Sequence, residues 1–111
     1  MIVEDLITYL NSETVGIPAY AEQPEAKYGY VIIDQTGSSR RNHVITTTLA
    51  IQSYGDTLYN AMILNESVKE AMDGFLESDN VARVELETDY NFTDTETKQY
   101  RWQAVYQITH Y

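Results

Sequence analysis

The chain has 111 residues, which fits one domain over 1–111 that buries roughly 65% of its unfolded surface and leaves no room for a second domain. It contains no cysteine, which excludes disulfide scaffolds, thiolate metal sites and thiol catalysis and is compatible with a reducing cytoplasm. Its 17 acidic side chains outnumber 7 basic ones, and this formal charge of −10 disfavours specific nucleic-acid binding, because phosphates bind clustered Lys and Arg.

The N-terminal third combines a helical pattern with two strand patterns. Residues 2–10 place apolar side chains at helical spacing, with two acids in the first turn, and predict an amphipathic helix. Val15 to Tyr20 predicts a short strand at a sheet edge, because Pro18 cannot donate a ladder hydrogen bond. A polar loop over 22–27 then leads into 28–35, whose apolar run predicts a buried strand.

The middle of the chain predicts a loop, a long strand and a long helix. Residues 37–42, Gly-Ser-Ser-Arg-Arg-Asn, lack apolar periodicity and predict a mobile loop. Residues 43–53 alternate and are rich in β-branched side chains, as is typical of a strand. From about 57 to 76, apolar residues repeat at three and four positions, and Ser53 or Asp56 is available to cap this helix.

The C-terminal third predicts a hairpin of two alternating strands, around 83–92 and 100–109. We expect Asp94 to Glu96 in the turn and a register in which paired residue numbers sum to 190, or a register displaced by two. In the first register Asp89 faces Arg101 on the solvent side. The expected fold is α+β, a mostly antiparallel sheet of about five strands packed with two helices in the order α-β-β-β-α-β-β.

One polar segment carries the only adjacent basic pair of this acidic chain. Ser38, Ser39, Arg40 and Arg41 follow a glycine and offer backbone N–H groups and two guanidinium groups to an anion. The segment lacks the lysine and the following helix of a P-loop. We therefore expect it to meet an acidic protein surface rather than a phosphate.

The other chemistry-bearing residues do not form a recognisable site. His43 and His110 have no neighbouring carboxylate at ligand spacing, and the acids Glu85, Glu87 and Asp89 read as one solvated strand face. We expect no enzyme activity and no cofactor. An acidic group on and after the long helix permits weak divalent cation binding at an interface, and consists of Glu66, Glu70, Asp73, Glu77 and Asp79.

The ten tyrosines are the most distinctive feature of the composition. Several must lie in the core, but tyrosine is also enriched at protein interfaces. Tyr28, Tyr54 and Tyr111 flank loops or the terminus, so we take them as candidate interaction residues.

The N-terminus shows no targeting pattern. Glu4 and Asp5 stand where a signal peptide needs positive charge, and the longest uncharged runs contain too many polar residues to cross a bilayer. We therefore expect a soluble protein with no membrane partner.

Six segments spread over nearly the whole chain support a family resemblance. They are Ile17 to Pro24, Tyr30 to Ile33 with Thr36 to Ser38, Leu49 to Gly55 leading into Leu58 and Tyr59, Val84 to Leu86, Asp89 to Asp94 and Tyr100 to Ala104. With these segments the chain resembles small tail proteins of long-tailed bacteriophages, in the group of tail terminators, head–tail joining proteins and minor tail proteins. The shared motifs are structural and contain no catalytic residues.

The resemblance implies a structural virion protein that forms a homo-oligomeric ring, usually a hexamer. Such a ring caps the tail tube, stops its polymerisation and contacts the head connector, in the tail or neck of a virion assembled in the bacterial host cytoplasm. In this setting we expect Arg40 and Arg41 to meet acids on a neighbouring subunit or on the tube protein. Acidic walls would let DNA pass without binding it.

Two other function classes remain open from the residues alone. One is a stand-alone module that binds a small ligand or a host protein through a tyrosine-rich surface. The other is a small hydrolase that uses scattered carboxylates.

Overall fold

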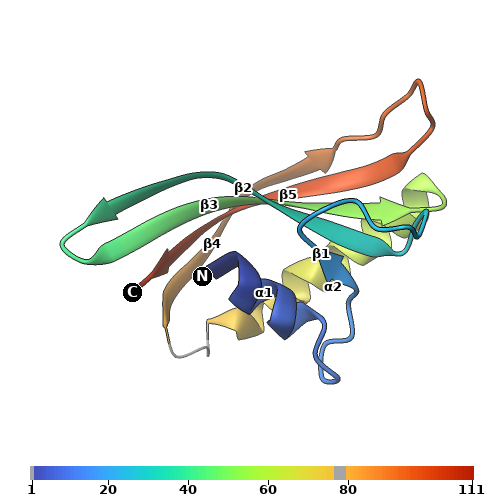
Figure 1. Cartoon of the computed structure of the whole chain (residues 1–111). Helices are drawn as coiled ribbons and strands as arrows, with labels where there is room; N and C mark the ends of the chain where they lie inside the picture. Colours follow the sequence, from blue (N-terminus) through green and yellow to red (C-terminus); the bar gives the residue numbers. More distant parts are fainter. Residues whose placement is uncertain (1, 77–79) are drawn as a thin grey trace.

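The computed structural model describes residues 2–76 and 80–111 and consists of two helices and one five-stranded sheet (Figure 1). The elements are α1 (Ile2–Leu10), β1 (Ala19–Tyr20), β2 (Tyr30–Arg41), β3 (Val44–Gly55), α2 (Leu58–Phe75), β4 (Val81–Asn91) and β5 (Tyr100–His110). Their order confirms the predicted α+β arrangement. The molecule measures 44 × 28 × 22 Å along its principal axes.

The sheet has the strand order β1-β2-β3-β5-β4, and only the β1–β2 pair is parallel. Both helices lie against the same face of the twisted sheet (Figure 1). At one side β1 pairs only with Val31 and Ile32, so the edge of β2 that faces away from β3 carries no described strand from Ile33 onward. At the other side β4 is the outermost strand. The fold therefore has two long open edges.

The core lies between the two helices and the sheet. Leu6 and Leu10 of α1 meet Met72 and Phe75 of α2, and all four side chains are fully buried. Burying each such side chain contributes about 1.5–3 kcal/mol. The helices are also joined by a hydrogen bond of 2.7 Å from the Tyr9 hydroxyl to the Ala71 carbonyl.

Helix α2 begins at a tight junction with β3. Thr57 is the N-cap, and its Oγ1 accepts a hydrogen bond of 3.1 Å from the backbone N–H of Asn60. The predicted caps Ser53 and Asp56 were therefore wrong, although the Asp56 carboxylate accepts a hydrogen bond from the Asn60 side chain. Thr57 has the extended backbone and the hydroxyl that an N-cap needs.

The predicted mobile loop over 37–42 is wrong, because this segment is the end of β2. Gly37 pairs with Thr48 and Arg41 pairs with Val44, after a bulge between Gln35 and Gly37. A two-residue turn with positive φ at Asn42 (52°) and His43 (67°) closes the hairpin, and this geometry matches the right-handed twist of the strands. Backbone hydrogen bonds to β3 keep the segment in the sheet. Because such bonds do not depend on side chains, they leave no apolar pattern in the sequence.

The predicted register of the C-terminal hairpin is wrong near the turn. Tyr90 pairs with Gln103, three positions away from the predicted partner, whereas Leu86 pairs with Tyr106, as in the alternative displaced by two. The difference arises from a bulge between Leu86 and Thr88, which inserts one extra residue in β4. Because side chains alternate along a strand, the bulge reverses which residues face the helices.

Candidate functional site

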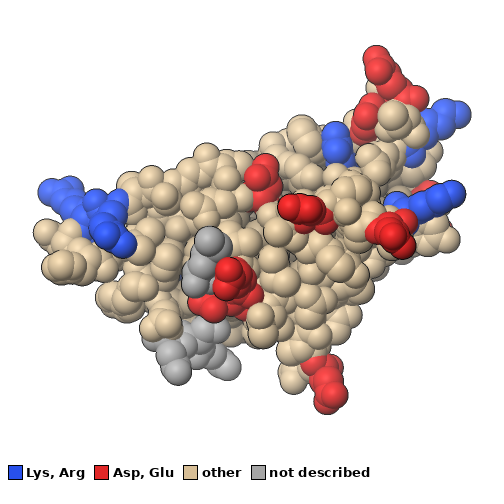
Figure 2. Space-filling view, in the orientation of Figure 1, with Lys and Arg blue, Asp and Glu red and all other residues tan. Residues whose placement is uncertain are grey.

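The predicted basic segment lies at the projecting end of the β2–β3 hairpin. Figure 2 shows basic atoms gathered at this end of the molecule, apart from the acidic atoms over the middle, while the opposite end of this face carries both basic and acidic atoms. Ser38, Ser39, Arg40 and Arg41 are all exposed. Within the described part of the chain, neither arginine forms an ion pair. We call residues 38–41 the basic tip.

The geometry of the basic tip does not match a phosphate loop. The segment turns back into strand β3, so no helix N-terminus points toward an anion bound there. Arg40 and Arg41 are neighbours on one strand, and their side chains leave opposite faces of the hairpin. The tip thus presents two separate charges suited to carboxylates on a partner surface.

The three candidate tyrosines lie in different environments. Tyr54 is only 3% exposed, and its ring stacks on Tyr30 at 4.8 Å between ring centroids. Tyr28 and Tyr111 are 57% and 68% exposed. The structure therefore leaves Tyr28 and Tyr111 accessible to a partner and buries Tyr54 in the fold.

A row of aromatic rings and one arginine crosses the sheet face opposite the helices, which sequence reasoning missed. Its members in strand order are Tyr20, Tyr30, Tyr54, Arg101, Phe92 and Tyr90. The Arg101 guanidinium lies 4.6 Å from the centroid of the Phe92 ring and donates to the Tyr54 hydroxyl at 3.2 Å. Arg101 therefore does not face Asp89 as predicted. Tyr54 is buried because it packs between Tyr30 and Arg101 in this row.

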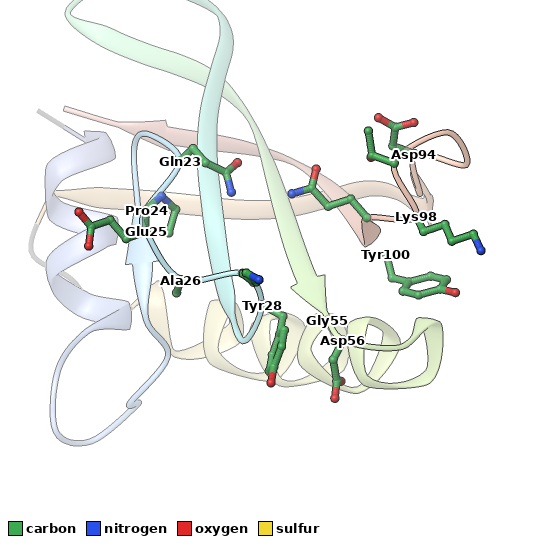
Figure 3. A pocket seen from close by; sticks show the side chains of 13 residues that line it. Gln23, Pro24, Glu25, Ala26, Tyr28, Gly55, Asp56, Asp94, Lys98 and Tyr100 are labelled. Carbon is green, nitrogen blue, oxygen red and sulfur yellow. The ribbon is translucent and has the colours of Figure 1, made fainter.

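A groove of about 630 Å³ lies between the 23–28 loop and the β4–β5 turn (Figure 3). Tyr28 and Asp56 project from neighbouring segments on one side, while Lys98 of the turn and Tyr100 at the start of β5 lie on the other. The Gln23 side chain is held by a hydrogen bond to the Tyr30 hydroxyl. The lining mixes both charge signs with aromatic rings and does not define one kind of ligand.

Asp89 lies at the centre of a polar contact between β4 and α2. Its Oδ2 accepts hydrogen bonds from Asn65 Nδ2 at 2.9 Å, Lys69 Nζ at 3.1 Å and Trp102 Nε1 at 3.3 Å. Burial opposes ionisation, but these bonds and the Lys69 charge outweigh it, so the pKa of the Asp89 carboxyl lies below its usual value. The predicted solvated strand face is confirmed for Glu85 and Glu87, which are exposed, and is wrong for Asp89, because the bulge turns Asp89 toward α2.

A second groove, of about 450 Å³, runs between α2 and β4. On the α2 side it is lined by Glu66, Glu70 and Asp73, which share one helix face, together with Lys69, and on the β4 side by Val84 and Leu86. Tyr106 of β5 also lines it and is 3% exposed, and its hydroxyl has no hydrogen-bond partner within 2–76 and 80–111. We call this the acidic groove. The predicted acids Glu77 and Asp79 lie outside the described residues.

The pKa of the Tyr106 hydroxyl is raised by its surroundings in the acidic groove. Burial and the charge of Asp73 raise the pKa of its hydroxyl from 10.0 to about 12. The folded state thus keeps Tyr106 neutral while the unfolded chain ionises near pH 10, so its contribution to stability is full below pH 10 and is lost between pH 10 and about 12.

We expect Tyr106→Phe to lose less stability than the wild type when the pH rises from about 9 to about 11.5. The difference in free energy of unfolding should be about 1–2 kcal/mol, measured by urea unfolding at both pH values. Tyr59→Phe is the matched control, because Tyr59 is 70% exposed. Equal alkaline losses in the wild type and Tyr106→Phe would contradict the placement of this hydroxyl.

The two histidines do not share a site with the acids. His110 is buried, and its Nε2 lies 2.8 Å from the Thr47 hydroxyl, whereas His43 is exposed in the hairpin turn. Over the described ranges, no three His, Cys, Asp or Glu side chains are grouped to hold a metal ion. In the same part of the chain, neither helix is long and apolar enough to span a bilayer.

In comparisons with protein-family models and with curated proteins, no model and no protein sequence matches this chain. The function must therefore be inferred from its surfaces and from the resemblance of its segments.

Proposed function

We propose that this protein is a structural subunit of a bacteriophage tail, a tail-terminator or head–tail joining protein. In this role it forms a homo-oligomeric ring that caps the tail tube and contacts the head connector in the virion neck. It acts through surface contacts, without catalysis and without a cofactor. The proposal is supported by the resemblance of the six segments and by the surfaces described next.

The observation that carries the proposal is the projecting hairpin with its unpaired basic tip. The tip and the acidic groove lie on different elements, β2 and α2–β4, so a contact between them in two copies is head-to-tail. Head-to-tail contacts generate a closed ring when the rotation between subunits closes. The open edges of β2 and β4 also provide backbone groups that a ring can cover.

Deletion of the gene from the phage or prophage that encodes it tests the proposal. We expect tails of uncontrolled length or tails without heads, seen by electron microscopy, because the tube then lacks its cap. Expression of the wild-type chain in trans should restore normal virions. A chain whose hairpin is shortened by deleting 38–47 and joining 37 to 48 should not, and normal tails after gene deletion would refute the proposal.

The groove between the 23–28 loop and the β4–β5 turn favours the alternative of a stand-alone binding module. In that case the protein would stay monomeric at every concentration, and gene deletion would leave tail length unchanged. Tyr28→Ala with Tyr100→Ala would then abolish function, because these two rings line the groove (Figure 3).

A further inference from the structure

We infer that the basic tip of one subunit docks in the acidic groove of the next copy of this chain. This inference rests on the proposed ring and names the contact that would close it. The tip supplies Arg40 and Arg41, and the groove supplies Glu70 and Asp73 beside the Tyr106 hydroxyl.

Within the described part of one subunit, the two arginines of the tip and two acids of the groove form no ion pair. In the described part of the molecule there are three ion pairs: Lys69 with Glu66, Lys69 with Asp89, and Arg83 with Glu85. Lys69 is thus already paired with two carboxylates, while Glu70 and Asp73 have no basic partner. Two free carboxylates therefore face a groove, and two free guanidinium groups stand at the far end of the hairpin.

The lining of the acidic groove suits a guanidinium group better than a small hydrated cation. The wall on the α2 side contains Glu70 and Asp73 beside Glu66 and Lys69, and the charge of Lys69 is already balanced by Glu66 and Asp89. Leu86, which is 40% exposed, forms an apolar wall on the β4 side. A planar guanidinium binds carboxylates with its N–H edge and packs its face on apolar or aromatic surface. An apolar wall beside charged groups is also the usual composition of a protein interface.

The Tyr106 hydroxyl is a second, independent indication of a partner. The side chain is almost wholly buried, yet its hydroxyl finds no hydrogen-bond partner between residues 2–76 and 80–111. Ser53 Oγ and Asn65 Oδ1 are the fully buried atoms without a partner in the described residues, whereas the Tyr106 hydroxyl opens onto the groove. A group that docks in the groove can therefore form a hydrogen bond with it. Its lone pairs can accept a hydrogen bond from Arg40 or Arg41 of a neighbour.

Arg83 of β4 lies level with Ser39 across the sheet, but it already forms an ion pair of 3.2 Å with Glu85. Arg40 and Arg41 are the only Lys or Arg between Lys27 and Lys69. The hairpin that carries them projects past the helices in Figure 1, as needed to reach a neighbouring molecule.

The test is a charge exchange between two variants, read as molar mass by light scattering over about 1 µM to about 1 mM protein, a range that includes weak specific association. We expect wild type to form a defined oligomer. Arg40→Glu with Arg41→Glu should raise the protein concentration needed for association at least tenfold. Glu70→Arg with Asp73→Arg should do the same, because each variant places like charges in contact.

An equimolar mixture of the two variants should recover the wild-type oligomer. Each reversed tip then meets a reversed groove, and each native tip meets a native groove, so an alternating ring with an even number of subunits satisfies every contact. Recovery also proves that both variants are folded. The matched controls are Lys27→Glu with Lys98→Glu and Glu22→Arg with Glu25→Arg, which change the net charge equally and should leave the oligomer intact.

Three results would overturn the inference: a wild type that is monomeric at every concentration, reversed variants that associate like wild type, or a mixture that fails to recover. Reversed variants that still form rings overturn this contact but leave the proposed function standing. Normal tails after gene deletion overturn the proposed function instead, and say nothing against an oligomer measured in solution.

Discussion

Gly55→Ala should destabilise the protein by about 3 kcal/mol, because a side chain at this position has no room. A Cβ on Gly55 would lie 2.4 Å from the backbone nitrogen of Ala61 and 2.8 Å from the Thr57 carbonyl oxygen. These are backbone atoms of the first turn of α2, so the clash cannot be relieved by a rotamer change. The helix must instead move away from β3, against which it packs.

Thermal unfolding measures this effect, and a drop of roughly 15 °C in the melting temperature is expected for a domain of this size. Gly37→Ala is the control, because a Cβ on Gly37 meets no atom within 4 Å. This control should be neutral or slightly stabilising, since alanine reduces the entropy of the unfolded chain. A Gly55→Ala protein as stable as Gly37→Ala would show that α2 does not begin as described.

Asp89→Ala should cost about 2 kcal/mol at neutral pH, because it leaves Asn65, Lys69 and Trp102 without their shared acceptor. The loss of a fully buried ion pair would cost more, but the Asp89 side chain is 26% exposed and partly screened by water. Urea unfolding at neutral pH measures the difference. Asp34→Ala, at an exposed acid of β2, is the control and should be nearly neutral.

The cost of Asp89→Ala should also depend on pH, with a defined sign. The pKa of Asp89 in the folded protein lies below the ordinary value of 3.8. The carboxylate therefore contributes its full stability above that value, and the contribution is lost as the pH falls through the lower folded pKa. We expect the wild type and Asp89→Ala to converge in stability at acidic pH, and a constant difference would contradict this placement of Asp89.

The helices and most strands could be predicted because their signals are local. The apolar repeats over Ile2–Leu10 and Leu58–Phe75 arise from one buried face of each helix. Alternation in β3 and β5 arises from the covered face of the sheet, where Leu49 and Ile108 are fully buried. A chain that buries one face of each element must show this periodicity, whatever its topology.

The end of β2 and the bulge in β4 could not be predicted, because neither feature leaves a periodic apolar pattern in the sequence. Gly37 to Arg41 lies past the helices and buries no side chain, so only backbone pairing with β3 makes it a strand. The bulge between Leu86 and Thr88 changes which residues face α2, but an extra residue leaves no mark in the pattern of an exposed edge strand. Asp89 therefore read as a solvated acid, although it is the hydrogen-bond acceptor for α2.

By itself, the sequence determined the element order, the absence of cysteine chemistry and the isolation of Arg40 and Arg41 in an acidic chain. Composition and short-range periodicity are sufficient for these, because neither depends on which distant segments meet. Only the tertiary structure decided that the two arginines stand at a hairpin tip, and that Glu70, Asp73 and Tyr106 line one groove. A groove is formed by elements far apart in the chain, so its shape exists only after α2 and β4 have packed on β5.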